Sequence, residues 1–196
     1  MGFPDIFFDE GVYMSRAMNV LETSNPQESY LYDHPYFGQI ILGGVLKLVG
    51  YPDSLNSESD AESLKELYMT PRIFMGLLAV LDTFLIYKIA EKKYNSKVAI
   101  LAAVIFAVLP FSWVFKRITL DALLLPFMLG SILVALHAQK SPKLYWVLFS
   151  GLLFGFAVFT KIPAIIFGFL AGLIIFQGRK KIADVMVWLF PVILIP

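Results

Sequence analysis

Two apolar runs, LYWVLFSGLLFGFAVF at residues 144–159 and IPAIIFGFLAGLIIF at residues 162–176, flank Lys161. Each run is slightly shorter than the ~20 residues that an α-helix needs to cross a bilayer. Joined, they would form one helix of more than thirty residues, which is long for a single span, and Pro163 falls at the junction. We therefore predict two membrane helices connected by a tight turn at Lys161.

Similar apolar runs recur along most of the chain. Further helices are predicted over residues 72–90, 98–115 and 120–138, and another begins near Val185. Hydrophobic residues make up 58% of the 196 residues, against ~45–50% in soluble domains. The predicted fold is all-α, with a transmembrane helical bundle of about five full spans and a truncated sixth over residues 70–196. Because the sequence stops inside an apolar run, we expect it to be a fragment of a longer protein.

Residues 1–69 differ in composition from this apolar part. Residues 1–66 contain eleven of the fifteen acidic residues and only three basic ones. We predict a first loop with two helices in the membrane interface, over residues 9–22 and 36–49, with Pro35 in the first turn of the second. Gln39 and Lys47 would mark the polar side of that second helix. Thr70 and Pro71 would cap and begin the first span.

The loops between spans indicate an orientation. If alternate loops share a side, one side has nine basic residues in short loops and the other has three: Lys116, Arg117 and Lys161. The excess of basic residues identifies the cytoplasmic side. Residues 1–70 would therefore face away from the cytoplasm, together with a set of charged residues from distant parts of the chain: Asp9, Glu10, Asp33, His34, Arg72, Arg117, Asp121 and Lys161.

Several classes of site are excluded or not indicated. The chain has no cysteine, so disulfides, thiol catalysis and thiolate metal sites are excluded. Phosphate-binding Walker and GxGxxG motifs and the HExxH zinc motif are absent. The adjacent pair Asp9 and Glu10 is not an Asp-X-Asp motif, so we predict neither a metal nor another cofactor. The basic clusters follow from membrane topology and do not indicate nucleic acid.

Five segments carry a family resemblance: FFDEGVY, YDHPYFGQIILGGVLKLVG, a span opening with Arg72, KRITLDALLL and GLLFGFAVFTK. Their order resembles the GT-C membrane glycosyltransferases, in particular the dolichyl-phosphate-mannose protein mannosyltransferases and the bacterial lipid A aminoarabinose transferases. The resemblance implies a transferase with a polyprenyl-phosphate-linked sugar as donor and a protein or lipid as acceptor. It also implies an integral, multi-pass protein of the cell membrane or the endoplasmic reticulum membrane.

The same resemblance implies roles for particular residues. The catalytic carboxylate would be Asp9, with Glu10 beside it. The carrier-phosphate element would be Asp33-His34-Pro35-Tyr36, where Tyr36 replaces a second proline of the family pattern. An Arg…Asp pair matches Arg117 and Asp121, and a Thr-Lys pair matches Thr160 and Lys161. With Arg72, the implied phosphate-binding set is His34, Arg72, Arg117, Asp121 and Lys161.

The chemistry of sugar-phosphate transfer is compatible with these residue types. The leaving phosphate is already a stable anion, so the reaction needs one base for the acceptor hydroxyl and cations for the phosphate. A single acidic centre among several basic residues fits an inverting displacement.

Other interpretations remain open from the sequence. Asp9 and Glu10 could serve only the start of a helix, Arg117 and Asp121 could pair with each other at i, i+4, and His34 could be a turn residue. Asp82 would lie near the middle of a span, where a charge is costly. A transporter would use Asp82, Asp121 and Lys161 as an intramembrane relay, and a non-catalytic membrane subunit would need none of these roles. An enzyme requires Asp9, Arg117 and Lys161 to converge on one cavity at the external side.

Overall fold

The computed structural model describes residues 8–24, 34–53, 61–109 and 117–196, in which all regular secondary structure is helical and no strand occurs. The predicted all-α class is thus confirmed. The elements, in chain order, are α1 (Phe8–Thr23), α2 (Phe37–Leu48), α3 (Ala61–Lys93), α4 (Ser96–Val108), α5 (Leu120–Ala138), α6 (Leu144–Thr160), the 3₁₀ helix η2 (Ile162–Phe167), α7 (Gly168–Arg179) and α8 (Ile182–Leu194).

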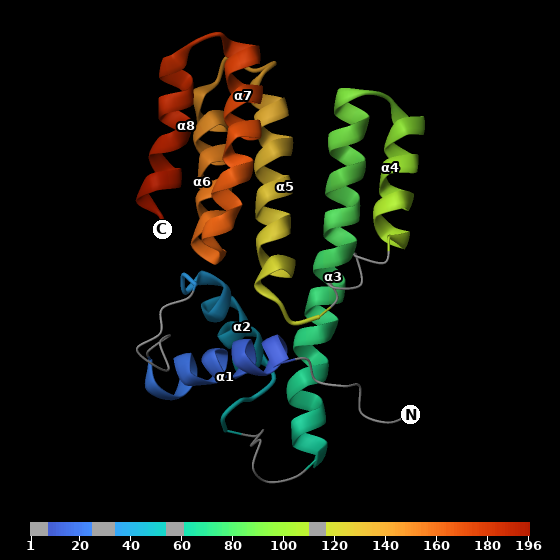
Figure 1. The fold of residues 1–196 in the computed structure, drawn as a ribbon, viewed down its shortest axis with the longest axis vertical. Coiled ribbons are helices and arrows are strands. Elements are labelled where there is room, and N and C mark those ends of the chain that lie inside the picture. Colours follow the sequence, from blue (N-terminus) through green and yellow to red (C-terminus); the bar gives the residue numbers. More distant parts are fainter. Residues whose placement is uncertain (1–7, 25–33, 54–60, 110–116) are drawn as a thin grey trace.

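Helices α5 to α8 form an upright bundle, and α3 with α4 forms a separate antiparallel hairpin beside it (Figure 1). Two serines join α5 to α6 inside the bundle. Ser131 Oγ donates to the Ser150 carbonyl at 2.8 Å, and Ser150 Oγ donates to the Ser131 carbonyl at 2.9 Å. These reciprocal bonds satisfy both hydroxyls. Such bonds matter inside a membrane, because a hydroxyl there cannot bond to water instead.

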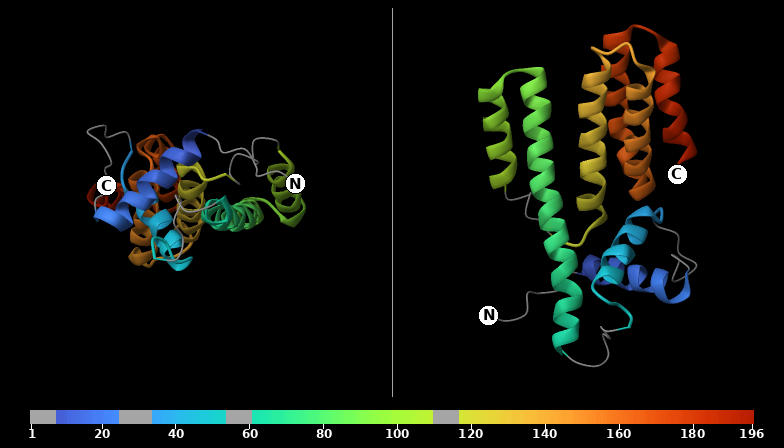
Figure 2. Two further views of the ribbon diagram at one scale, coloured as in Figure 1. Left: turned by 90° about the horizontal axis from the view of Figure 1, so that it is seen from below. Right: turned by 180° about the vertical axis from the view of Figure 1, so that it is seen from behind.

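Helices α1 and α2 lie under the lower end of the bundle, beside the lower half of α3 (Figure 2). Buried Met14 and Ala17 of α1, Leu42 and Leu46 of α2, and Leu67 of α3 belong to one apolar cluster. Gln39 was predicted on the polar side of the second helix, but it is only 1% exposed. The prediction was wrong because Gln39 shares its face of α2 with Leu42, Gly43 and Leu46, all of which are buried.

The predicted first turns of two helices, each next to a proline, were wrong. Pro35 precedes α2 and does not belong to its first turn, since the helix begins at Phe37 after Tyr36 as N-cap. Helix α3 does not begin at Thr70 and Pro71 but runs through them from Ala61, as one helix of 33 residues. The helix therefore crosses the predicted boundary at residue 70, and its lower half links the N-terminal layer to the hairpin.

Helix α4 is shorter than the predicted span over residues 98–115. It begins after Asn95, whose side chain accepts a hydrogen bond from the Val98 amide at 3.0 Å, and it ends at Val108. Pro110 follows one residue after the C-cap Leu109. A proline restricts the residue before it to extended backbone, which explains the end of the helix at this point. Residues 110–116, with Lys116, lie outside the described part of the chain.

The predicted turn at Lys161 is confirmed. Helix α6 ends at Thr160, Lys161 has extended backbone angles, and the 3₁₀ helix begins at Ile162 with Pro163 in its first positions. Pro163 has no amide hydrogen and its ring would clash with the carbonyl four residues earlier, which favours a break here, although α3 continues through Pro71. The chain reverses at the lower end of the bundle, which puts the Lys161 side chain there.

Glycines 151 and 155 allow α6 and α8 to approach closely. A Cβ atom at Gly151 would overlap the backbone oxygen of Trp188, and one at Gly155 would lie 2.8 Å from the oxygen of Pro191. Small residues at such contacts are typical of membrane helix packing.

The helix lengths agree with a membrane protein. Three described stretches are long and apolar enough to cross a bilayer: Lys65–Lys93, Leu120–Ala138 and Ile162–Arg179. Helices α2, α4, α6 and α8 are apolar but shorter. Six spans therefore stay a prediction.

Candidate active site at the lower end of the bundle

Glu10 lies at the centre of a buried ionic cluster. Its side chain is 0% exposed, although it belongs to the first turn of α1. Arg72 of α3 holds it with two bonds, from Nη2 to Oε2 at 2.7 Å and from Nε to Oε1 at 3.2 Å. This bidentate geometry is the strong form of an Arg–carboxylate contact. The cluster joins α1 to the middle of α3.

The segment before α5 is tied to the same carboxylate. Arg117 Nη1 lies 3.5 Å from Glu10 Oε2, and the backbone amide of Ile118 donates to Oε1 at 3.2 Å. Thr119 then caps α5, because its hydroxyl accepts from the Ala122 amide at 3.3 Å. Glu10 thus fixes the position at which α5 begins, across 108 residues of sequence.

Asp9 has a different environment from its neighbour. It is exposed, and its carboxylate makes no hydrogen bond or ion pair with the residues that the structure describes. A helix turns by about 100° per residue, so adjacent side chains point in different directions. Asp9 is not the N-cap, since α1 begins one residue earlier at Phe8. An exposed carboxylate therefore stands one residue from a buried cluster of two guanidinium groups.

Asp121 and Lys161 form a second ion pair at this end. Lys161 Nζ donates to Asp121 Oδ1 at 2.9 Å and to Oδ2 at 2.8 Å. The Lys161 side chain is 21% exposed and the Asp121 side chain 45%. Arg117 and Asp121 therefore do not pair with each other at i, i+4: each contacts a residue from another helix. Arg117 of the first cluster and Asp121 of the second are four positions apart in the sequence.

A pocket of about 310 Å³ adjoins the second ion pair. Asp121 and Lys161 line it together with apolar side chains of α5 and of the 3₁₀ helix, among them Leu125, Met128 and Phe167. A polar end with an apolar continuation suits a ligand that has a charged group and a hydrocarbon chain.

The remaining predicted residue, His34, is half-buried against α1. Its ring centroid lies 6.3 Å from that of Tyr13. Asp33, from the same sequence element, lies outside the described residues. His34 thus belongs to the N-terminal layer that contains Asp9 and Glu10.

Asp82 lies apart from all these groups. It is ten residues beyond Arg72 on α3, about 15 Å further along the helix axis. It is 0% exposed, and neither carboxylate oxygen has a hydrogen-bond partner among the described residues. The pocket that contains Asp121 and Lys161 is not lined by Asp82, and it is not lined by Asp9 or Arg117 either, so the convergence that an enzyme requires stays a prediction. The shared path that a transporter requires of Asp82 and Asp121 is therefore not seen in this pocket.

The structure thus brings Arg72 and Arg117 to Glu10, and Asp121 to Lys161. Residues that were not predicted also contribute, namely the Ile118 amide and the Thr119 cap. Thr119 three residues before the Ala122 amide is a recognisable capping signal, whereas nothing in the sequence marks the Ile118 amide. Within the described ranges no group of three or more His, Cys, Asp or Glu side chains could hold a metal ion, and the absence of a metal remains a prediction.

Comparison with known proteins supplies a family. A family model described as dolichyl-phosphate-mannose-protein mannosyltransferase matches residues 68–196, which is more than half of the chain. The match includes Arg72, Arg117, Asp121 and Lys161, but not Asp9, Glu10 or His34. No curated protein and no solved structure matches the chain.

Proposed function

Because this chain belongs to the dolichyl-phosphate-mannose-protein mannosyltransferase family, we propose that it transfers a sugar from a polyprenyl phosphate to a protein or lipid acceptor. The chain is an integral membrane protein of a glycosyltransferase family, and the GT-C type is part of the proposal. The observation that carries the proposal is the exposed Asp9 next to the buried cluster of Glu10, Arg72 and Arg117. This arrangement combines a base open to an acceptor with two cations fixed by the next residue of the helix.

In the proposed reaction Asp9 is the base. The acceptor hydroxyl oxygen attacks C1 of the sugar from the face opposite the phosphate, and its proton passes to the Asp9 carboxylate. The bond between C1 and the phosphate oxygen breaks, and its electron pair leaves with the polyprenyl phosphate. One displacement inverts the configuration at C1. Glu10 does not touch the substrates in this scheme, since it is fully buried; it positions Arg72, Arg117 and the start of α5.

Arg72, Arg117 and Lys161 are proposed to bind the donor phosphate, with His34 as a further contact. The Arg72 and Arg117 side chains are 15% and 18% exposed, so each keeps a part accessible to solvent. Cations in a site of reduced dielectric stabilise a phosphate more strongly than they do in water. Asp121 would orient Lys161 through the two bonds it accepts.

The carrier lipid and the orientation complete the proposal. The hydrocarbon tail of the donor would extend from the Lys161 end of the pocket along its apolar wall, with α2 lying in the membrane interface. Residues 1–70 would face away from the cytoplasm, because the loops at the opposite end contain most of the basic residues of short loops. The membrane would be the cell membrane or that of the endoplasmic reticulum.

A donor assay tests this function. Membranes containing the protein are supplied with mannosyl-phosphoryl polyprenol labelled in the sugar, and release of polyprenyl phosphate is measured. We expect release above that of membranes without the protein, and no use of a sugar nucleotide when polyprenyl phosphate is depleted. Equal rates in both membranes, with mannosyl and aminoarabinosyl donors alike, would contradict the proposal.

Lys161→Ala should weaken donor binding. A hydrogen bond to a charged group contributes about 1.5–3 kcal/mol, so we expect KM for the donor to rise by roughly 10- to 100-fold. The Asp121–Lys161 pair is partly exposed, so its loss should change stability little. Lys47→Ala is the matched control, because Lys47 is an exposed cation of α2 outside the pocket. An unchanged KM in Lys161→Ala would remove Lys161 from the phosphate site.

A further inference from the structure

A second cavity lies between α3, α5 and α7, at the opposite end of the molecule from Glu10. Its volume is about 380 Å³. Each helix lines it with a stretch of eight residues, from Ile86 to Lys93, from Leu129 to Leu136 and from Leu170 to Gln177. Seven helical steps of 1.5 Å give a depth of about 10 Å along the membrane normal.

The polar and apolar lining residues of this cavity are separated by depth. The polar ones are Lys93, Tyr94 and Gln177, which lie at the outer end of α3 and near the end of α7 and are exposed. The deeper residues, such as Ile86, Leu129 and Leu170, are aliphatic. The cavity is therefore amphipathic, with a hydrogen-bonding and cationic mouth above an apolar interior.

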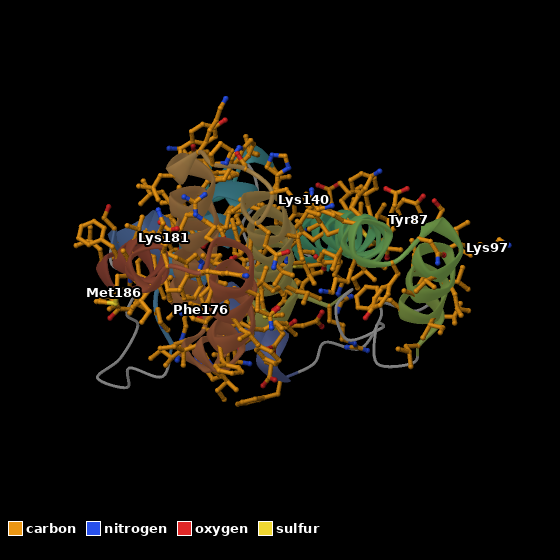
Figure 3. All side chains as sticks on the ribbon, turned by 90° about the horizontal axis from the view of Figure 1, so that it is seen from above. Tyr87, Lys97, Lys140, Phe176, Lys181 and Met186 are labelled. Carbon is orange, nitrogen blue, oxygen red and sulfur yellow. The ribbon has the colours of Figure 1, made fainter. Side chains whose placement is uncertain are left out.

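The surroundings of the mouth are positively charged. Lys92 Nζ lies 3.3 Å from His137 Nδ1, which brings a second lysine of α3 to the end of α5. Figure 3 looks onto this end and shows Lys97, Lys140 and Lys181 spread across it. At this end of the described part of the chain, two acidic side chains are already paired. Glu91 pairs with Lys88 at 2.8 Å, and Asp184 pairs with Arg179 at 2.6 Å. An anionic group at the mouth would thus meet an excess of positive charge.

The lining of the cavity suits a lipid, because its interior is aliphatic and its mouth has Lys93. A single hydrocarbon chain is thinner than a helix and has no polar backbone to satisfy at this depth.

We propose that this cavity binds an anionic membrane phospholipid. One acyl chain occupies the apolar interior between α3, α5 and α7, and the phosphate contacts Lys93, Tyr94 and Gln177. This site is separate from the proposed transfer site and serves a structural lipid, not the sugar donor. Such a lipid would fill the space between the α3–α4 hairpin and the bundle.

Native mass spectrometry of the full chain in detergent tests the site. The probes are palmitoyl-oleoyl phosphatidylglycerol, phosphatidylcholine with the same chains, and soluble glycerol 3-phosphate. A basic residue near a membrane surface contributes about 1 kcal/mol to binding of an anionic lipid, so Lys93→Gln should lower phosphatidylglycerol affinity about fivefold. Phosphatidylcholine affinity should stay unchanged. Ala90→Phe, which fills the interior, should weaken both lipids.

Lys97→Gln is the matched control, because Lys97 is an exposed lysine of the same end but does not line the cavity. Its affinity for phosphatidylglycerol should change less than twofold. Equal binding of the two lipids, or equal effects of Lys93→Gln and Lys97→Gln, would overturn the proposal, as would glycerol 3-phosphate binding as tightly as the lipid. If Ala90→Phe does not fold, the comparison of Lys93→Gln with Lys97→Gln tests the proposal without it. No readout depends on transferase activity.

Discussion

Asp9→Asn should abolish sugar transfer while leaving the protein folded in the membrane. A positioned general base contributes roughly 10²- to 10⁴-fold to a rate, and an amide cannot accept the acceptor proton. The asparagine keeps the shape of the side chain, and the carboxylate that it replaces is exposed. We therefore expect the transfer rate to fall by at least about 100-fold, and stability to change by no more than about 0.5 kcal/mol.

The measurement is the release of polyprenyl phosphate from the labelled donor, together with thermal unfolding in detergent. Asp53→Asn is the matched control, because Asp53 is an exposed acidic residue that follows α2 and lies outside the site. It should retain the full rate. Full turnover by Asp9→Asn would show that Asp9 is not the base, and would favour a role for the acidic pair at the start of α1 alone.

Glu10→Ala should destabilise the protein and also stop transfer. Removing one partner of a buried ion pair costs about 3–5 kcal/mol, because the remaining charges stay buried without compensation. Here the carboxylate is 0% exposed, and Arg72 and Arg117 lie against it. In a chain of this size, 1 kcal/mol corresponds to about 2–4 °C, so the midpoint of thermal unfolding should fall by roughly 6–20 °C.

The control for this variant is Lys88→Ala, which removes an ion pair of similar length. Lys88 and Glu91 are 2.8 Å apart but 40% and 35% exposed. An exposed pair contributes about 0–1 kcal/mol, so the midpoint should fall by no more than about 4 °C. Similar shifts for Glu10→Ala and Lys88→Ala would contradict the role of Glu10 as the anchor of the site. Loss of transfer in Glu10→Ala at a temperature where the variant is folded would separate its positioning role from its effect on stability.

These two variants also distinguish adjacent residues that the sequence treats as one acidic pair. Substitution of Asp9 is expected to lower the transfer rate and leave stability unchanged, whereas substitution of Glu10 is expected to lower both. The difference follows from solvent exposure, because the Asp9 side chain is exposed and the next side chain, Glu10, is fully buried.

The sequence by itself determined the helices. Backbone groups cannot remain unsatisfied in a membrane, so a long apolar run is helical, and the run over residues 144–176 is too long for one span and must turn between its halves. For this reason the helix over residues 120–138 and the turn at Lys161 could be predicted. The charge pattern likewise placed Glu10, Arg72, Arg117, Asp121 and Lys161 at one end of the molecule, because alternating spans return to the same side.

Only the tertiary structure decided which of these charges meet. Glu10 pairs with Arg72, 62 positions away, and accepts from the backbone amide of Ile118, 108 positions away. Asp121 contacts Lys161 in preference to Arg117, four residues before it. Gln39 is buried although its residue type suggested a polar face. Side-chain partners depend on how whole helices pack and rotate against each other, and no local pattern contains that information. The sequence therefore specifies the helices and the end at which the charged groups collect, while packing separates the exposed Asp9 from the buried Glu10.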